Sequence, residues 1–309
     1  MSDWPIPPFD DHVVALFPGQ GALTGGAGLA WRESHHWPVV TRIADVTGLD
    51  VEGLLLTAID AEVVRTDHAQ IATFALSIVG YLSLLDREIR PRYLLGHSLG
   101  EFSALVASGL LSVDEGARLI AVRGAAMASA AERAEGSMVA LMGGDEGARA
   151  ALGGLEGVWV ANVNGTGQIV VSGTRAGLDD LLARHRELGW RRATPLAVGG
   201  AFHSPLMAPA QVEFDAALAA TSWGATDATL IANVDGRVHS SADDWRELLS
   251  RQLTSPVQFL EATLALPAQV TTSIELPPGG VLTGLTKRIR TFDHQYAPLS
   301  WRELEEVPT

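Results

Sequence analysis

The chain contains no cysteine. Disulfides, thiolate metal sites and a cysteine nucleophile are therefore excluded. Lysine is almost as scarce, because Lys287 is the only lysine among 22 basic residues. The 36 acidic residues outnumber the basic ones and give a formal net charge of −14. This balance argues against a nucleic-acid partner, since such binding works by neutralising phosphates.

The chain also lacks the marks of a secretory signal or a membrane span. Its first twelve residues, MSDWPIPPFDDH, carry acids and prolines in place of a basic start and an apolar core. The longest apolar stretch, 71–85, is interrupted by polar residues and is shorter than the ~20 residues that cross a bilayer. We interpret it as a buried helix, and we expect a cytoplasmic protein without a membrane partner.

The residues that are present predict an α/β fold. With 309 residues, of which 47% are hydrophobic, the chain is able to bury a large core. From Ser137 to Val198 the patterns follow the order β-α-β-β-α-β, which is that of a ferredoxin-like unit. We predict a large α/β-hydrolase-like subdomain with a parallel sheet, formed by 1–132 and 199–309, and an inserted ferredoxin-like small subdomain, 133–198.

The pentapeptide GHSLG, Gly96 to Gly100, follows a short apolar run and precedes a helical pattern. This is the sequence form of a nucleophile elbow, in which the central serine projects into a cleft at the end of a strand. Ser98 is therefore the candidate nucleophile. The alternative is an ordinary turn between a strand and a helix, because a lone GxSxG motif also occurs by chance.

Two backbone amides are candidates for an oxyanion hole. The N–H of Leu99 begins the helix after the elbow, where the helix dipole favours negative charge. Gln20 lies in the loop PGQG at the end of a predicted strand, 13–17, and its N–H is a possible second donor. A plain turn glutamine is the alternative.

Arg123 and His203 occupy unusual surroundings. On the predicted helix from Val113 to about Ala131, the neighbours of Arg123 at three and four residues are all apolar. Its guanidinium must find an anion or reach water. The anion is either a structural partner such as Glu101 or Asp114, or a substrate carboxylate. His203 lies in a glycine-rich loop and is either a general base or a histidine satisfied by the backbone.

Several motifs occur in a characteristic order along nearly the whole chain. They are FPGQG at 17–21, GHSLGE at 96–101, Arg123, AFHSPLM at 201–207, PVQF at 256–259 and VLTGLTKR at 281–288. In this order the chain resembles the malonyl-CoA:acyl carrier protein acyltransferases of fatty acid and polyketide synthesis.

The resemblance implies a role for each motif residue. Ser98 is the acylated nucleophile and His203 its base, while Gln20 and Leu99 form the oxyanion hole. A backbone carbonyl in the segment matching Gln258 orients the histidine, and Arg123 pairs with the malonyl carboxylate. The substrate-binding residues also include Gln70, at the start of the predicted helix 69–85, and Gly200 and Phe202 beside the base.

The resemblance further implies a reaction and its partners. The malonyl group passes from malonyl-CoA to Ser98 and then to the phosphopantetheine thiol of an acyl carrier protein, with no permanently bound cofactor and no metal. Phe202 is expected to crowd an α-branched acyl group. Gly200 departs from the family's HAFH string and is expected to open space, which leaves a larger extender unit as an alternative. Pro277-Pro278-Gly279-Gly280 also departs from the family's valine-glycine-proline-glycine string.

Two other functions remain as alternatives at this point. An acyl-carrier-protein hydrolase would use the same nucleophile, although a buried cation at Arg123 would bring it nothing. A catalytically silent module would keep the fold alone. An acidic carrier protein also needs a basic docking patch, for which there are two candidates: residues 184, 186, 191 and 192 in the small subdomain, or 287, 288 and 290 near the C-terminus.

Overall fold

The computed structural model of the chain describes residues 7–308. The start of the N-terminal stretch discussed above, residues 1–6, lies outside the described residues. The large body contains a six-stranded sheet with the order β10-β9-β1-β2-β7-β8. Its strands are β1 (Asp10–Phe17), β2 (Pro91–Gly96), β7 (Thr229–Ile231), β8 (Val238–His239), β9 (Thr272–Glu275) and β10 (His294–Tyr296).

The large sheet is parallel except for the pair formed by β7 and β8. In a parallel sheet the carboxyl ends of the strands meet at one edge, where α/β proteins gather their ligands. The pairing of β1 with β2 ends at Phe17 opposite Gly96. The PGQG loop and the GHSLG elbow therefore leave the sheet side by side.

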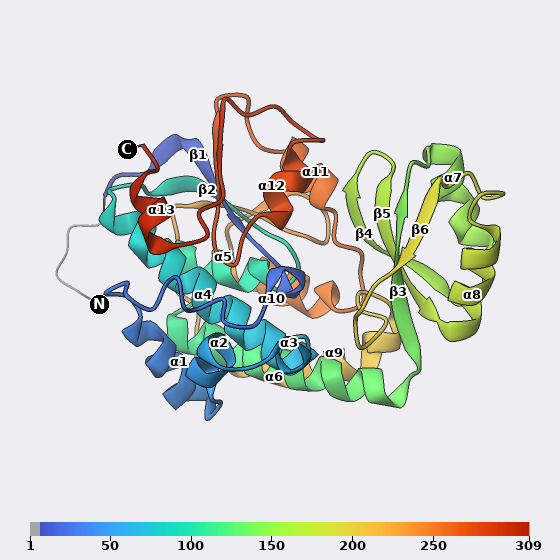
Figure 1. Cartoon of the computed structure of the whole chain (residues 1–309), viewed down its shortest axis with the longest axis horizontal. Helices are drawn as coiled ribbons and strands as arrows, with labels where there is room; N and C mark the ends of the chain where they lie inside the picture. Colours follow the sequence, from blue (N-terminus) through green and yellow to red (C-terminus); the bar gives the residue numbers. More distant parts are fainter. Residues whose placement is uncertain (1–6, 309) are drawn as a thin grey trace.

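The segment from β3 to β6 forms a second, antiparallel sheet with the order β4-β5-β3-β6. With its two helices this is the ferredoxin-like arrangement predicted from the sequence, and it forms the body at the right of Figure 1. The exact limits of the insertion, 133–198, stay a prediction. The elements are β3 (Gly136–Met142), α7 (Glu146–Ala151), η2 (Leu152–Gly154), β4 (Val158–Gly165), β5 (Gln168–Thr174), α8 (Arg175–Arg184) and β6 (Arg192–Pro195).

Side chains of β3 and β5 alternate between two cores, as the two-residue period of a strand requires. Val139 and Val171 pack in a small core with α7 and α8. Met138 and Val170 instead belong to the core of the large body. The small sheet thus has one face under its own helices and the other against the large body, as Figure 1 shows.

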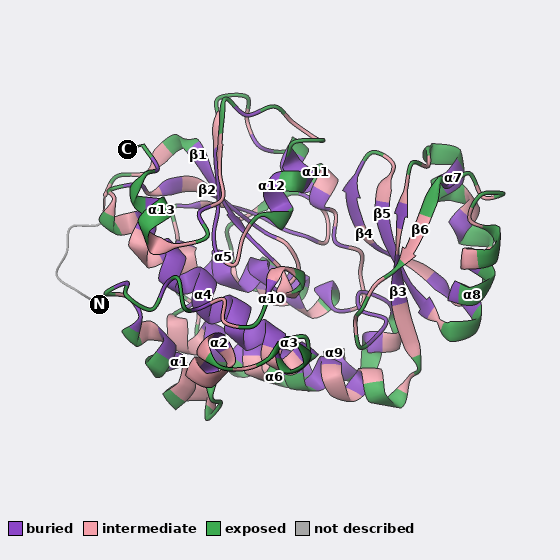
Figure 2. Cartoon of the chain, in the orientation of Figure 1, coloured by how far each residue is buried: buried purple, intermediate pink, exposed green. Residues whose placement is uncertain are grey.

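Helices cover the large sheet, and Figure 2 shows both buried and exposed residues along them. The helices of this body are η1 (Gln20–Ala22), α1 (Pro38–Thr47), α2 (Val51–Leu56), α3 (Asp60–Val63), α4 (Thr66–Asp86), α5 (Gly100–Ser108), α6 (Val113–Arg133), η3 (Pro205–Met207), α9 (Ala208–Ala220), α10 (Ala242–Gln252), α11 (Phe259–Leu264), α12 (Val281–Thr286) and α13 (Trp301–Glu305).

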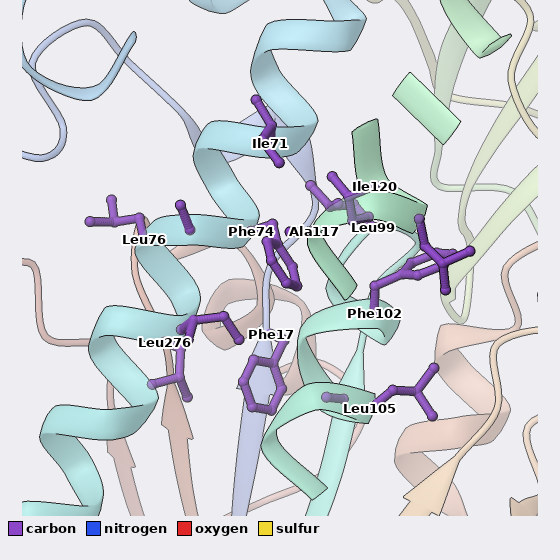
Figure 3. Packing of buried hydrophobic residues seen from close by; sticks show 14 of the residues in the cluster. Phe17, Ile71, Phe74, Leu76, Leu99, Phe102, Leu105, Ala117, Ile120 and Leu276 are labelled. Atoms are coloured by element: carbon purple, nitrogen blue, oxygen red, sulfur yellow. The ribbon is translucent and has the colours of Figure 1, made fainter. Parts of the chain in front are cut away.

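The main core lies where α4, α5 and α6 meet the sheet. Figure 3 shows Phe17 of β1 among Phe74 of α4, Phe102 of α5 and Ile120 of α6. All four side chains are fully buried. Burying one such side chain contributes about 1.5–3 kcal/mol. This packing therefore fixes the positions of α4, which precedes β2, and of α5, which follows the elbow.

The helix α4 is longer than the apolar run 71–85 suggested. It has 21 residues and is, by length and composition, able to cross a membrane, so the prediction that this stretch is too short to do so was wrong. However, 78% of its apolar window is buried inside the protein, and a core helix of this kind passes the same test. Its burial favours the interpretation as a core helix.

Candidate active site

The elbow places Ser98 in a strained conformation between β2 and α5. Its φ of 52° lies in the left-handed region that L-residues rarely adopt. The flanking glycines are required by close backbone contacts. A Cβ at Gly96 would lie 2.1 Å from the nitrogen of Glu101, and one at Gly100 would lie 1.9 Å from the carbonyl oxygen of Phe17. This geometry is that of a nucleophile elbow and not of an ordinary turn.

The side chain of Asn233, in the loop after β7, is hydrogen-bonded to the backbone of the elbow at two places. Its Oδ1 accepts a hydrogen bond from the backbone nitrogen of Ser98 at 2.6 Å. Its Nδ2 donates to the carbonyl oxygen of Gly96 at 2.7 Å. Both groups of the amide are satisfied, and Asn233 is fully buried. One side chain thus holds the strained serine from both sides along the chain.

Ser98 and His203, 105 positions apart, form a hydrogen-bonded pair. Ser98 Oγ lies 2.7 Å from Nε2 of His203. Nδ1 of the ring lies 2.7 Å from the carbonyl oxygen of Gln252. A carbonyl only accepts, so the proton sits on Nδ1 and leaves Nε2 free to accept the hydroxyl proton. The pair thus has the polarity that a nucleophile and its base require.

Burial keeps the imidazole neutral. His203 is 4% exposed. Burial, and next the nearby charge of Arg123, lower the pKa of His203 to about 3. His203 is therefore unprotonated, and able to accept a proton, throughout the neutral pH range.

The prediction that Gln258 supplies the orienting carbonyl was wrong. The carbonyl belongs to Gln252, the last residue of α10. The last carbonyls of a helix have no partner within it, and they carry partial negative charge, so they suit an imidazole N–H. Gln258 instead donates its backbone N–H to the carbonyl of Asn233 at 2.7 Å. It thereby fixes the loop that braces the elbow.

Arg123 of α6 reaches the same centre. It is 1% exposed, and its Nη2 lies 3.1 Å from Ser98 Oγ. The guanidinium also donates to two amide oxygens, those of Gln70 at 2.6 Å and Gln252 at 2.8 Å. Gln70 of α4, predicted as a substrate-binding residue, is therefore beside the guanidinium. Burial lowers the pKa of Arg123 to about 10, which leaves it charged at neutral pH.

Within residues 7–308, Arg123 forms no ion pair. Of the structural partners considered above, Asp114 pairs with Arg42 at 2.7 Å. Glu101 is buried nearby and its charge acts on the Arg123 pKa, but the two groups form no salt bridge. The Nε of Arg123 is also buried without an acceptor in the described chain. A buried, unneutralised guanidinium beside a serine hydroxyl has the chemistry of a carboxylate receptor.

The two predicted oxyanion-hole residues emerge from neighbouring strands. Gln20 and Leu99 each lie three positions beyond the registered pair Phe17 and Gly96. The PGQG loop lies close against the elbow, since a Cβ at Gly19 would lie 3.1 Å from the carbonyl oxygen of His97. Within residues 7–308 neither the Gln20 nor the Leu99 backbone N–H forms a hydrogen bond. Two free donors next to the serine are what an oxyanion requires.

The space expected at Gly200 is filled. A Cβ at this position would lie 2.6 Å from Cβ of Ala131 on α6 and 3.1 Å from the ring of Phe202. Gly200 therefore allows the histidine loop to approach α6, and it does not widen a pocket at its own Cβ position. Phe202 is 4% exposed, and its carbonyl accepts a hydrogen bond from Ser172 of the small sheet.

The small body touches the elbow directly. Oδ1 of Asn164, in β4, lies 2.9 Å from Nε2 of His97, the residue before Ser98. The backbone N–H of Val257 donates to the carbonyl of Ala161 in β4, and the carbonyl of Val257 accepts from the N–H of Val163. The PVQF motif therefore joins the two bodies. The site therefore sits where both subdomains meet.

One other group of side chains has the composition of a metal site. In the described chain, the donor atoms of His35, His36 and Asp86 lie within 4.8 Å of one another. His36 Nε2 lies 2.7 Å from the carboxylate, and His35 is exposed. The contacts join side chains at the protein surface, and the group shares no residue with the site around Ser98.

The sequence reasoning missed Gln252, Asn233 and the role of Glu101. A usable signal existed for Gln252. Ser241 caps α10 by accepting from the nitrogen of Asp244, and an amphipathic pattern then runs to Gln252. Glu101 was visible as the last residue of GHSLGE, but nothing local indicates that it is buried.

An α/β body with a serine elbow, a histidine hydrogen-bonded to that serine and a ferredoxin-like insertion defines a class of acyl-transferring enzymes. The family described as acyl transferase domain matches residues 16–298, and the chain belongs to it. A curated relative, the malonyl CoA-acyl carrier protein transacylase of Bacillus subtilis (strain 168), is 38% identical over 289 residues, which cover 90% of each chain. That of Staphylococcus aureus (strain COL) is 33% identical, with 90% of this chain and 92% of the relative covered.

Solved structures agree. The MCAT from Mycobacterium tuberculosis superposes with a TM-score of 0.89 at 33% identity, covering 95% of this chain and 98% of that chain. A type II PKS acyl-carrier protein in complex with its malonyl-transacylase gives a TM-score of 0.89 at 30% identity, with the same coverage. The fold expected from the sequence is thus confirmed, and the chain is an acyltransferase.

Proposed function

We propose that this acyltransferase moves a malonyl group from malonyl-CoA to the phosphopantetheine thiol of an acyl carrier protein. The observation that carries the proposal is the Arg123 guanidinium, which is buried, unpaired with any acid in residues 7–308, and 3.1 Å from Ser98 Oγ. A cation at that distance favours an acyl group that ends in a carboxylate. The names of the relatives and the carrier-protein complex support the same substrates.

The reaction proceeds in two halves. Ser98 Oγ attacks the thioester carbonyl while His203 Nε2 takes its proton, and the backbone N–H groups of Gln20 and Leu99 stabilise the oxyanion. The C–S bond then breaks and the CoA sulfur leaves with the proton from His203. In the second half the carrier thiol attacks the malonyl-serine ester, and the same groups act in reverse.

The charge of Arg123 also couples substrate binding to the base. Arg123 is one cause of the lowered pKa of His203. When the malonyl carboxylate pairs with the guanidinium, that electrostatic effect weakens and the histidine becomes more basic. An acyl group without a carboxylate leaves the histidine a weaker base. The arrangement thus favours malonyl in the chemical step as well as in binding.

Two narrower features are part of the proposal. Phe202 restricts branching next to the acyl carbonyl, so malonyl is preferred over larger extender units, which remain the alternative substrates. The enzyme works in the cytoplasm, where both thioester substrates are found. A hydrolase that uses the same serine is the competing function, and it is separated from transfer by the fate of the acyl-enzyme.

A basic docking patch for the carrier protein is also proposed. Arg290 is removed from the earlier candidates because its guanidinium donates to the carbonyls of Leu266, Pro267 and Val270. Lys287 and Arg288 remain exposed at the end of α12. Arg288 donates to Gln168 of β5 and so lies where the two bodies meet. Reversing both charges is expected to slow transfer to the carrier protein and to leave acylation by malonyl-CoA unchanged.

The test is intact-mass measurement of Ser98 acylation with malonyl-CoA and acetyl-CoA. Wild type is expected to form a malonyl adduct that persists until a carrier protein is added. Arg123→Ala is expected to lower kcat/KM for malonyl-CoA by about a hundredfold and that for acetyl-CoA much less. Arg118→Ala, on an exposed face of the same helix, is the matched control. Rapid release of malonate without an acceptor would support the hydrolase instead.

A further inference from the structure

Beneath the elbow lies a buried carboxylate that the proposed reaction does not use. Glu101 is 1% exposed, although it lies in the first turn of α5, three residues after Ser98. Its Oε1 accepts from the backbone nitrogen of Asn233 at 2.6 Å. Its Oε2 accepts from Nε2 of Gln252 at 2.5 Å. Burying a charge is costly, so a carboxylate at this position calls for a functional reason.

The two partners of Glu101 are the residues that hold the site together. Asn233 braces the backbone on both sides of Ser98. Gln252 accepts from His203 through its backbone and from Arg123 through its side chain. The nitrogen of the same side chain also donates to the carbonyl of Ser98 at 3.0 Å. Through Asn233 and Gln252, the Glu101 carboxylate is thus connected by hydrogen bonds to Ser98, His203 and Arg123.

The direction of these hydrogen bonds is fixed by chemistry. A carboxylate only accepts, so the side-chain amide of Gln252 must turn its NH₂ group toward Glu101. Its oxygen must then face the other way, where Nη2 of Arg123 donates to it at 2.8 Å. The carboxylate is one of two acceptors that hold the NH₂ group on this side, the other being the carbonyl of Ser98, so removing it weakens the preference for this orientation. If it turned over, its NH₂ group would face the guanidinium, and two donors would meet.

We propose that Glu101 is a positioning residue for selection of the acyl group, because it orients the Gln252 amide and, through it, the carboxylate-binding guanidinium of Arg123. This inference rests on the proposed role of Arg123 as the malonyl receptor. It assigns the specificity of the site to a chain of three side chains, of which only Arg123 touches the substrate.

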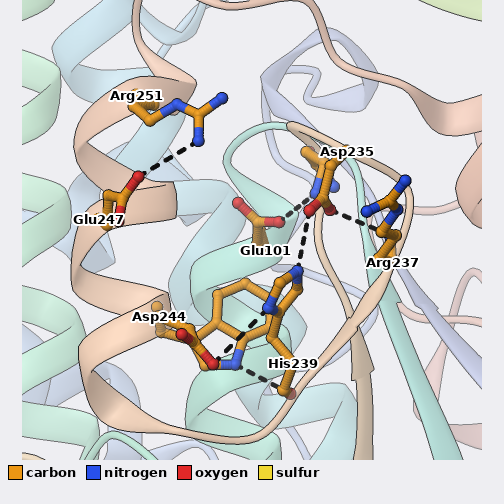
Figure 4. A network of polar contacts seen from close by, with 9 residues as sticks. Glu101, Asp235, Arg237, His239, Asp244, Glu247 and Arg251 are labelled. Carbon is orange, nitrogen blue, oxygen red and sulfur yellow. Dashed lines mark hydrogen bonds and ion pairs between the residues drawn. The ribbon is translucent and has the colours of Figure 1, made fainter.

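The surroundings of Glu101 contain one further acid. Asp235 lies on the loop after Asn233, and its charge acts on Glu101. It is held by His239, whose Nε2 lies 2.9 Å away, as Figure 4 shows beside Glu101. Burial raises the pKa of Glu101 to about 7, and the hydrogen bonds from Asn233 and Gln252, and after them the charge of Arg123, oppose that rise. A test of the carboxylate form therefore belongs at about pH 8.5.

The decisive variant is Glu101→Gln, which keeps the shape and removes one acceptor. The backbone nitrogen of Asn233 and the side-chain amide of Gln252 each donate to a different oxygen of Glu101. A glutamine has an NH₂ group in place of one of these oxygens, so one of the two donors loses its acceptor. We expect kcat/KM for malonyl-CoA to fall about tenfold, while that for acetyl-CoA changes less than about threefold. The malonyl-to-acetyl ratio is the readout, since general loosening of the site would lower both.

Glu275 provides a matched control. It is also fully buried, and its carboxylate accepts from the nitrogens of Leu282 and Thr283, but it has no bond to Gln252. Glu275→Gln is expected to lower stability and to leave the ratio at the wild-type value. A second test combines Glu101→Gln with Arg123→Ala. Because Glu101 acts through Arg123, the double variant is expected to show the same ratio as Arg123→Ala alone.

The outcomes distinguish failure of the positioning role from failure of the proposed function. If wild type does not prefer malonyl-CoA over acetyl-CoA, the proposed function fails. If wild type shows that preference and Glu101→Gln keeps it, the positioning role is overturned. Should Glu101→Gln not fold, Gln252→Met replaces it, because this variant keeps the backbone carbonyl for His203 and removes the amide. An unchanged ratio in Gln252→Met overturns the inference equally.

Discussion

The carbonyl oxygen of Gln252 accepts a hydrogen bond from Nδ1 of His203 at 2.7 Å, at the C-terminal end of α10. In a serine triad this place belongs to a carboxylate, which stabilises the charged imidazolium. A carbonyl has only a partial charge and orients the ring without strongly favouring its protonation. Burial, and next the charge of Arg123, lower the pKa of His203, and the hydrogen bond to the Gln252 carbonyl raises it too little to offset them.

The first prediction concerns the pH dependence of acylation. The base must be neutral, and the pKa of His203 is lowered to about 3 in the folded protein. Protonation therefore begins only far below the ordinary histidine value of 6.5. We expect kcat/KM for acetyl-CoA to show no inflection near pH 6.5, in stopped-flow acylation between pH 8 and the lowest pH at which the fold persists.

Arg123→Ala is the informative variant for this profile. Removing the guanidinium removes one of the causes of the low pKa, so the acid limb is expected to move toward neutral pH. Acetyl-CoA is the substrate of choice here because it does not need Arg123. An acid limb near pH 6.5 in wild type would contradict the assigned burial effect.

The second prediction concerns the glycine that follows the elbow. A Cβ at Gly100 would lie 1.9 Å from the carbonyl oxygen of Phe17, which belongs to the central strand β1. Backbone on both sides leaves no room to shift, so Gly100→Ala is expected to destabilise the protein by more than about 3 kcal/mol. Urea unfolding followed by circular dichroism measures the change.

Gly284→Ala supplies the control for that substitution. Gly284 lies inside α12, and a Cβ there has no neighbour within 4 Å. Alanine is the better helix former by about 1 kcal/mol, so this variant is expected to be as stable as wild type or slightly more so. Equal stability of the two alanine variants would argue against the close approach at the elbow.

The parts of this site that were predictable are those recorded in local sequence. The glycines around Ser98 and the apolar face around Arg123 follow from the backbone and burial needs of the residues themselves. They are visible in a window of a few positions. The β-α-β-β-α-β order of the insertion is similarly local, since it depends on where short apolar runs alternate.

The parts that failed depend on where distant segments meet. Which carbonyl faces His203 is decided by the end of a helix 49 positions away, and α10 was not predicted at all. The neighbouring motif PVQF drew the prediction to Gln258, which serves the Asn233 loop instead. The space at Gly200 was misjudged for the same reason, because Ala131 of another helix occupies it.

The third prediction concerns Asn233. Its Oδ1 accepts from Ser98 and its Nδ2 donates to Gly96, so both halves of the amide are used. Asn233→Asp keeps the acceptor but loses the donor, and it leaves the carbonyl of Gly96 unsatisfied. We expect a loss of about 1–3 kcal/mol in stability, together with slower acylation by both acyl-CoAs. A fall confined to malonyl-CoA would show that Asn233 acts on specificity instead.

The fourth prediction concerns the pH dependence of stability. Burial raises the pKa of Glu101 from 4.5 to about 7, so between these values the folded protein binds a proton that the unfolded chain has released. The stability contributed by Glu101 is therefore complete below pH 4.5 and is lost as the pH rises through about 7. His203 acts in the opposite direction. Its contribution is complete above pH 6.5 and is lost as the pH falls toward 3.

Comparison of wild type with Glu101→Gln isolates the carboxyl group, because every other titrating residue is common to both. The glutamine does not titrate, so the difference in unfolding free energy, wild type minus variant, is expected to decrease from pH 5 to pH 8 and then to level off. Urea unfolding at pH 5.5, 7.0 and 8.5 measures this difference. A difference that grows with pH would mean that the carboxylate is stabilised in the fold, and that the hydrogen bonds from Asn233 and Gln252, together with Arg123, outweigh the cost of burying Glu101.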